Sequence, residues 1–287
     1  MTTAVTSAWI IERIERLWAG PGNDMRRADP ERAWDPPLVG FANGADAIWM
    51  QYKAVVGSFH WTPLEAWHQA YPDQAIDAEE LTVISYVLPQ TVATKRDQRE
   101  QARFPSERWA RTRVFGEQFN HELRRDLAQA LTDASHPAVA PMESPAWGIK
   151  DSEQYVYAST WSERHAAYAA GLGTFGLCDG LITPVGKAMR AGSVVARLSV
   201  PASPRPYTDH HAYCLFYAKG TCGACIDRCP VGAISEAGHD KRKCEAHLNR
   251  SRPYVNETYG FDGYGCGLCQ VGVPCESGIP EGIAPAT

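Results

Sequence analysis

The sequence lacks any long apolar stretch: in 287 residues, no hydrophobic run approaches the roughly 18 residues of a membrane-spanning helix. Its first seven residues carry neither the basic segment nor the apolar segment of an export signal. The formal net charge is −5, so the chain has no basic surplus with which to bind an extended nucleic-acid backbone. We therefore expect a soluble, cytoplasmic protein with no membrane partner.

Cysteine is concentrated at one end of the chain, with eight of nine cysteines in the last 74 residues. In a reducing compartment, such cysteines are more often metal ligands than disulfides. The centre of the array reads Cys222-Gly-Ala-Cys225-Ile-Asp-Arg-Cys229-Pro230. A run of this C-x2-C-x3-C-P form is typical of bacterial ferredoxins. Eight thiolates are enough to hold two [4Fe–4S] clusters, so we expect electron transfer in this region.

Zinc is the alternative explanation for paired cysteines, and it would need two tetrahedral sites built from the same eight positions. Two features favour iron–sulfur clusters over zinc. Cys229-Pro230 is followed by Val-Gly-Ala-Ile, and a second C-x2-C pair occurs at Cys266 and Cys269.

Hydrophobic periodicity predicts only part of the secondary structure. Residues 7–20 and 106–132 have apolar side chains at helical spacing and predict two amphipathic helices. Residues 81–88 and 193–200 predict buried strands, each closed by proline. Residues 21–75 are rich in Pro, Gly and Trp with little periodicity, so we expect irregular structure there.

Basic residues outnumber acidic ones by seven to three between positions 95 and 113. The ordinary interpretation is the solvated start of a long helix. The functional interpretation is a small site for a phosphate or an acidic substrate.

A glycine-rich segment, Ala170-Gly171-Leu-Gly173-Thr-Phe-Gly176, contains the G-x-G-x-x-G spacing. A dinucleotide-binding fingerprint needs a strand before this segment and an acidic residue about 20 positions after it. Here a predicted helix precedes it, and residues 189–196 contain no acid, so we do not expect a Rossmann site. The glycines still allow backbone to approach a flat or charged ligand closely.

Three segments in this order resemble a known family: the glycine-rich segment, Leu181-Ile-Thr-Pro-Val-Gly186-Lys-Ala-Met-Arg190-Ala-Gly192-Ser-Val-Val, and the cysteine array. From residue 84 to residue 275, the chain resembles the epoxyqueuosine reductases and reductive dehalogenases. Members with this arrangement join a cobalamin-binding domain, related to flavin nitroreductases, to a bacterial ferredoxin-like domain with two [4Fe–4S] clusters.

The resemblance implies an α/β (α+β) fold in three parts. Residues 1–75 would form an N-terminal helix and an irregular covering segment. Residues 76–205 would form the cobalamin-binding-like α/β domain, and residues 206–287 the ferredoxin-like iron–sulfur domain.

The resemblance also implies ligands for each cofactor. One cluster would be held by Cys214, Cys222, Cys225 and Cys275. The other cluster would be held by Cys229, Cys244, Cys266 and Cys269. The corrin would be contacted by Gly171, Gly173, Gly176, Thr183, Gly186, Arg190 and Gly192.

Tyr157 is the candidate catalytic acid, because gapless counting places it where the family carries its proton donor. That donor is an acidic residue in epoxyqueuosine reductases and a tyrosine in reductive dehalogenases. A phenol can donate a proton when a cation or hydrogen bond steadies the phenolate, whereas the alternative is an aromatic side chain packed beside the cofactor. We expect the ninth cysteine, Cys178, to be a small buried apolar residue without a redox role.

The expected function is a cobalamin-dependent iron–sulfur reductase acting on a small organic substrate, by reductive dehalogenation or deoxygenation. Electrons would come from ferredoxin or flavodoxin and pass through both clusters to the cobalt. The alternative is a ferredoxin-type carrier or reductive activator without a corrinoid, although a carrier has no need of the 200 residues before the clusters. A tRNA epoxyqueuosine reductase is the third possibility. The net charge, the missing acid at position 157 and the lack of a tRNA-binding repeat domain after the clusters lead us not to expect tRNA as a partner.

Overall fold

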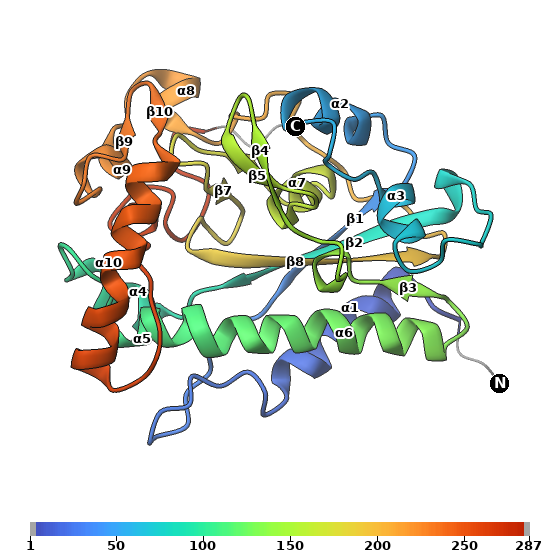
Figure 1. The fold of residues 1–287 in the computed structure, drawn as a ribbon, viewed down its shortest axis with the longest axis horizontal. Coiled ribbons are helices and arrows are strands. Elements are labelled where there is room, and N and C mark those ends of the chain that lie inside the picture. Colours follow the sequence, from blue (N-terminus) through green and yellow to red (C-terminus); the bar gives the residue numbers. More distant parts are fainter. Residues whose placement is uncertain (1–3, 284–287) are drawn as a thin grey trace.

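The computed structural model describes residues 4–283 and contains a four-stranded antiparallel sheet at its centre (Figure 1). The strand order is β1-β2-β8-β3, with bounds Leu38–Asn43, Leu81–Pro89, Met189–Arg197 and Ala138–Val139. The two central strands, β2 and β8, pair over nine residues, from Leu81 opposite Arg197 to Pro89 opposite Met189. The α/β fold class expected from the sequence is confirmed.

Side chains of β2 alternate between two hydrophobic cores, as the two-residue period of a strand requires. Leu81, Val83 and Val87 belong to the core on one face of the sheet. The core on the other face contains Ile84, Tyr86 and Leu88. All nine residues of β2 are buried, because the strand has a neighbour on each side and helices on both faces.

Helices cover both faces of this sheet (Figure 1). α1 (Ser7–Ala19) and α6 (Glu117–Asp133) pack on the face that carries Ile84. The other face is covered by α2 (Ile48–Val55), α3 (Pro63–His68) and α7 (Glu163–Ala169). Each helix therefore contributes one apolar face to a core and leaves the other face to solvent.

The long helix predicted at residues 106–132 is confirmed, with one irregularity. It starts as α5 (Glu107–Arg111), widens into a π-helical turn (Thr112–Gly116) and continues as α6. The Ser106 side chain caps the start by accepting a hydrogen bond from the Trp109 backbone N–H. π-helical turns are frequent at functional sites, and this one carries Arg113 into the cavity described below.

The helix at residues 7–20 and the strand at residues 81–88 are confirmed as α1 and β2. The second predicted strand, at residues 193–200, is displaced: β8 begins four residues earlier, at Met189. It also ends at Arg197, three residues before the predicted end. Its start was not recognised because the small residues Ala191 and Gly192 gave no strand signal.

The expectation of irregular structure throughout residues 21–75 was wrong for three segments, which form β1, α2 and α3. These elements are six to eight residues long, and so short a run carries little periodic signal. Glycine is unusual inside a strand, and Gly40 in β1 further weakened the strand signal. The position requires glycine because a Cβ there would collide with the Ala170 carbonyl at the end of α7.

The cysteine-rich segment lies beside α4 (Val92–Arg99) and α5, at the end of the sheet where β2 finishes and β8 begins (Figure 1). Its longest element is α10 (Lys241–Tyr259), which the sequence analysis did not predict. The shorter ones are α8 (Leu215–Lys219), α9 (Ala224–Asp227), β9 (Ile234–Ser235), β10 (Gly238–His239) and the 3-10 turn η4 (Leu268–Gln270). The domain boundaries at residues 75 and 205 stay a prediction.

The remaining elements are small. They are the hairpins β4 (Ile149–Ser152) with β5 (Val156–Ser159) and β6 (Thr174–Phe175) with β7 (Leu181–Ile182), and the 3-10 turns Ala78–Glu80 and Pro141–Glu143. Across residues 4–283, none of the helices combines the length and apolar character needed to cross a bilayer.

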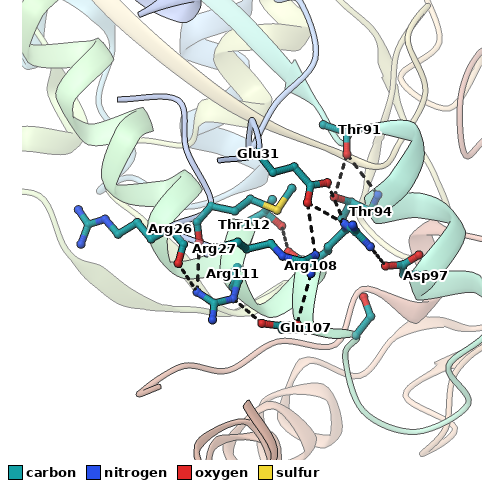
Figure 2. A network of polar contacts seen from close by, with 12 residues as sticks. Arg26, Arg27, Glu31, Thr91, Thr94, Asp97, Glu107, Arg108, Arg111 and Thr112 are labelled. Atoms are coloured by element: carbon teal, nitrogen blue, oxygen red, sulfur yellow. Dashed lines mark hydrogen bonds and ion pairs between the residues drawn. The ribbon is translucent and has the colours of Figure 1, made fainter. Parts of the chain in front are cut away.

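Arginines of the basic stretch at positions 95–113 are engaged with carboxylates of the chain itself (Figure 2). Arg108 Nε lies 2.8 Å from Glu31 Oε1, and the same guanidinium pairs with Asp97. Arg111 Nε lies 2.7 Å from Glu107 Oε1. The network joins α4, α5 and the loop containing Glu31, so Arg108 and Arg111 have a structural role, whereas Arg113 lines the cavity described below.

We predict that Leu127→Ala destabilises the fold through the α6 core. Leu127 is fully buried, so truncation should lower the free energy of unfolding by about 2–5 kcal/mol. Met50, which is 63% exposed on α2, provides the matched control. Met50→Ala should change the free energy of unfolding by about 0.5 kcal/mol or less. Urea unfolding of both variants measures the difference; equal effects would contradict the assignment of this core.

Candidate iron–sulfur and reductase site

Four cysteines, which we call the first cysteine set, line one small cavity. They are Cys214, Cys222, Cys225 and Cys275. Cys214 precedes α8, Cys225 lies on α9, and Cys275 arrives from the loop after η4. The fold therefore gathers residues from both ends of the cysteine-rich segment at a single point.

A neighbouring cavity of about 480 Å³ is lined by Cys178 and by four further cysteines, which we call the second cysteine set. They are Cys229, Cys244, Cys266 and Cys269. Cys244 lies on α10 and Cys269 on η4. The Gln98 side chain of α4 donates a hydrogen bond to the Cys266 carbonyl at 2.6 Å, which ties this set to the sheet-bearing part of the chain.

Neighbouring cysteines of the central motif serve different sets, as in the ferredoxin crossover. Cys225 belongs to the first set and Cys229 to the second. The Ala233 backbone N–H donates a hydrogen bond to the Cys229 sulfur at 3.2 Å. All nine cysteines are free of disulfides. Two groups of four thiols fit the donor requirement of two cubane clusters, and their roles as ligands stay a prediction.

A larger cavity of about 690 Å³ lies between the π-helical turn and α6, the start of β8, and α10. It adjoins the cavity of the second set, because the following residues line both: Arg113, Arg164, Gly180, Met189, Arg190, Arg252, Tyr264 and Gln270. Six Arg or Lys residues and three Asp or Glu residues line the larger cavity. Its lining is therefore polar with a positive balance.

Arg124 on α6 organises one wall of the larger cavity, although its side chain is only 1% exposed. Its guanidinium lies 3.1 Å from Glu117, 2.9 Å from Glu143 and 3.1 Å from Glu163. A buried charge of this kind requires partners, and three carboxylates share the one cation.

The three carboxylates do not ionise alike. Burial raises the pKa of Glu163 to about 7, although Arg124 and a hydrogen bond from the Ser193 hydroxyl oppose this shift. Burial acts on Glu117 in the same direction, but there Arg190, Arg124 and Arg113 prevail and lower the pKa to about 2. Arg190 Nε lies 2.7 Å from Glu117 Oε2. Glu163 is thus a carboxyl group able to hold or release a proton near neutral pH.

A second wall is formed by Tyr264 and two arginines. The carbon atoms at the centres of the Arg113 and Arg252 guanidinium groups lie 4.6 and 4.2 Å from the centroid of the Tyr264 ring. Arg113 also donates a hydrogen bond to the Tyr264 hydroxyl. Burial and the nearby Arg190 lower the pKa of Arg113 to about 10, so it stays charged at neutral pH.

Comparison with known proteins relates this chain to one group of reductases. An epoxyqueuosine reductase of Bacillus anthracis is 32% identical over 124 residues, which are 41% of this chain and 30% of that protein. Over this segment the chain is similar in sequence to the epoxyqueuosine reductases. The resemblance predicted from the glycine-rich segment and the cysteines is confirmed. The chain spans less than a third of the length of the first curated relatives that it matches. No protein-family profile matches it.

Among solved structures, an epoxyqueuosine reductase with an epoxyqueuosine-modified tRNA-Tyr stem loop matches 96% of this chain and 66% of its own. The TM-score is 0.48 and the identity 15%. A catabolic reductive dehalogenase matches 96% of this chain and 37% of its own, with a TM-score of 0.49 and 13% identity.

Tyr157 lies on β5 and lines the cavity of the second cysteine set rather than the larger cavity. The Lys241 ammonium lies 5.4 Å from the centroid of the Tyr157 ring and donates a hydrogen bond to the Tyr157 carbonyl at 2.9 Å. Burial raises the pKa of Tyr157, and Glu245 and Cys244 add to this, so the phenol stays protonated. Its role as the catalytic acid stays a prediction.

The glycines expected at the corrin approach other parts of the protein instead. A Cβ at Gly171, Gly173 or Gly186 would collide with the carbonyl of Pro204, Ile182 or Glu276, respectively. One at Gly192 would collide with Tyr86, and Gly176 lines the cavity of the first cysteine set. The close approach inferred from the glycine spacing is therefore made by protein backbone and side chains. Contact between these glycines and a corrin remains untested.

Of the two side chains expected at the corrin, only Arg190 lines the larger cavity. The Thr183 hydroxyl is fully buried, and it donates a hydrogen bond to the Gly186 carbonyl at 2.8 Å. The grouping of Arg124 and Glu117 with Glu143 and Glu163 was not predicted, because it joins side chains of α6 to two segments that are distant in sequence.

We predict that Glu163 titrates near pH 7. The folded pKa lies above the ordinary value of 4.5, so the protonated form stabilises the fold at low pH. That contribution is lost as the pH rises from about 4.5 through 7. Infrared spectra should show a protonated-carboxyl band that disappears near pH 7 and is absent in Glu163→Gln. Glu143→Gln is the control and should keep the band, whereas loss of the band by pH 5 in the unmutated protein would contradict the prediction.

Proposed function

We propose that this chain is an iron–sulfur oxidoreductase of the epoxyqueuosine reductase type. The observation that carries the proposal is the adjacency of two four-cysteine sites and a polar cavity, with eight residues shared between the second site and that cavity. This arrangement supports electron delivery into the cavity, where an acceptor would be reduced.

The two cysteine sets would hold two [4Fe–4S] clusters, which supply one-electron transfer when bound. The first set lies near the surface helix α8, where Tyr217 and Lys219 are exposed. The second set lies against the larger cavity. A path from an external donor such as ferredoxin or flavodoxin would therefore enter at the first set and leave at the second.

A corrinoid would lie in the larger cavity, beside the cluster held by the second cysteine set. Arg113, Arg190 and Arg252 line both cavities and offer donors to amide carbonyls and to the phosphate of a nucleotide tail. When bound, a corrinoid supplies a redox-active cobalt for the reduction. The fit rests on these donors, because the glycines first expected at the corrin are packed against protein.

Within this site the chain's own residues would position the acceptor and supply the proton. Glu163 faces the larger cavity with a carboxyl whose pKa is about 7, so it can donate a proton at neutral pH. Arg124 and Ser193 hold that carboxyl in place. Tyr157 is the alternative donor, and it lies beside the second cysteine set.

The substrate that the relatives favour is epoxyqueuosine in tRNA, which runs against our expectation that tRNA would not be a partner. Curated relatives bear the name epoxyqueuosine reductase, and one solved epoxyqueuosine reductase contains a tRNA stem loop. Net charge was the wrong criterion, because the cavity has a positive balance although the whole chain carries −5. A small organic substrate is the second candidate, supported by the tyrosine at position 157.

A ferredoxin-type carrier without a substrate site is the contrasting function. It would have no use for a cavity of about 690 Å³ lined by six basic residues beside the second cysteine set. We therefore favour an enzyme over a carrier.

We predict about eight iron atoms per chain after anaerobic purification, because each [4Fe–4S] cluster carries four. Cys225→Ser, in the first set, and Cys266→Ser, in the second, should each lose about half of the iron. Iron, zinc and sulfide analysis measures the outcome. Stoichiometric zinc without sulfide would overturn the cluster assignment.

A second experiment tests the cavity. Arg252→Gln should weaken cobalamin binding about 10- to 150-fold in anaerobic equilibrium dialysis, since a lost charged hydrogen bond costs about 1.5–3 kcal/mol. Arg250→Gln, an exposed change on the same helix outside both cavities, should not. Equal affinity in all three proteins would argue against a corrinoid in this cavity.

The substrate is tested by turnover with reduced methyl viologen and added cobalamin. The substrates are an epoxyqueuosine-containing tRNA stem loop and a brominated phenol. We expect conversion of the tRNA nucleoside, measured by mass spectrometry. Bromide release without nucleoside conversion would favour the small-substrate alternative.

A further inference from the structure

Lys187 is a buried lysine at the junction between the central sheet and the cysteine-rich segment. It precedes β8 and is only 3% exposed. Its backbone N–H donates a hydrogen bond to the Cys275 carbonyl at 2.8 Å. The aliphatic stem packs on Gly180, where a Cβ would come within 2.8 Å of Lys187 Cδ. The local fold therefore holds this side chain in one place.

Within residues 4–283, no carboxylate lies within ion-pairing distance of the Lys187 ammonium. Its hydrogen-bond partner is the sulfur of Cys178, at 3.3 Å. An ammonium taken out of water without an anionic partner is costly. The side chain thus requires negative charge from another source, and sulfur atoms are what surround it.

The hydrogen bond between these two residues connects the two cysteine sites. Lys187 lines the cavity of the first cysteine set, together with Cys214, Cys222, Cys225 and Cys275. Cys178 lines the cavity of the second set, and its sulfur lies within hydrogen-bonding reach of Cys269 in that set and of Cys225 in the first. One buried cation and one thiol therefore lie between the two places where clusters would be bound.

Cluster potentials depend on nearby charge and on hydrogen bonds to sulfur. Each cluster takes up one electron on reduction and so becomes more negative. A fixed positive charge nearby stabilises the reduced form more than the oxidised form, most strongly where water is excluded.

We propose that the Lys187 charge raises the reduction potential of both clusters. It would act directly on the cluster at the first set, and through its hydrogen bond to Cys178 on the cluster at the second set. This inference rests on the two-cluster proposal above. Cys178 would then be neither a cluster ligand nor an inert core residue, but the link that extends the effect of the charge from one site to the other.

The test is a redox titration of the dithionite-reducible protein, followed by electron paramagnetic resonance with mediators present. Lys187→Met removes the charge and keeps an unbranched apolar side chain. We expect both one-electron steps to move to lower potential, by at least a tenfold change in the reduced-to-oxidised ratio at a fixed potential, or 59 mV. Lys187→Arg should restore most of the potential, because it keeps the charge.

Lys219→Met is the matched control, since Lys219 is exposed on α8 and its charge is screened by water. It should leave both potentials unchanged. Unchanged potentials in an iron-replete Lys187→Met protein would overturn the inference, as would equal shifts in the methionine and arginine variants. Iron content is measured first: absence of clusters in the unmutated protein refutes the two-cluster proposal itself.

Cys178→Ala provides a second test if Lys187→Met does not retain iron. This variant keeps the Lys187 ammonium and removes the Cys178 sulfur. The reduction potential of the cluster at the second set should therefore fall, while that of the cluster at the first set is preserved. All the iron should be retained. Loss of half of the iron would identify Cys178 as a ligand and overturn the inference.

Discussion

The pairing of β2 with β8 is the constraint on which the rest of the molecule depends. Nine residue pairs run from Leu81–Arg197 to Pro89–Met189, and their alternating side chains form the centre of both cores. Helices α1 and α6 can cover one face and α2, α3 and α7 the other only because this pair has a fixed register. A slip by one residue would exchange the two faces of β2 and place Ser85 where Ile84 packs.

The same register brings the chemistry together. The pair ends at Met189, so the start of β8 delivers Arg190 to the larger cavity and Lys187 to the first cysteine set. The cysteine-rich segment docks against this end, through Gln98 and the Lys187 backbone. Apart from α10, its helices are only four or five residues long, and it has few buried apolar residues of its own besides ones such as Ile234, Val255 and Val271. Segments of this composition commonly gain their stability from bound metal.

Periodic segments could be predicted from sequence, and compact or long-range features could not. The helix from Ser106 and the strand from Leu81 carry repeated apolar signals over many residues, and both were predicted. β1 was missed because it is six residues long and contains Gly40. The two cysteine groups followed from a resemblance, since spacing alone allows many groupings. The cavity could not be predicted, because Glu117, Glu163 and Arg252 approach one another only through tertiary packing.

The contrast between global and local charge shows why the net charge is a poor guide to what this cavity binds. Charged side chains that form ion pairs within the chain, such as Arg108 with Glu31, largely cancel each other's electrostatic potential at a distance. Inside the larger cavity, six basic side chains face three acidic ones, and protonation of Glu163 would shift the balance further toward positive. A concave surface concentrates such a potential. An anionic group of a cofactor or substrate would therefore meet the local field of Arg113, Arg190 and Arg252, and the net charge of −5 would influence its binding less.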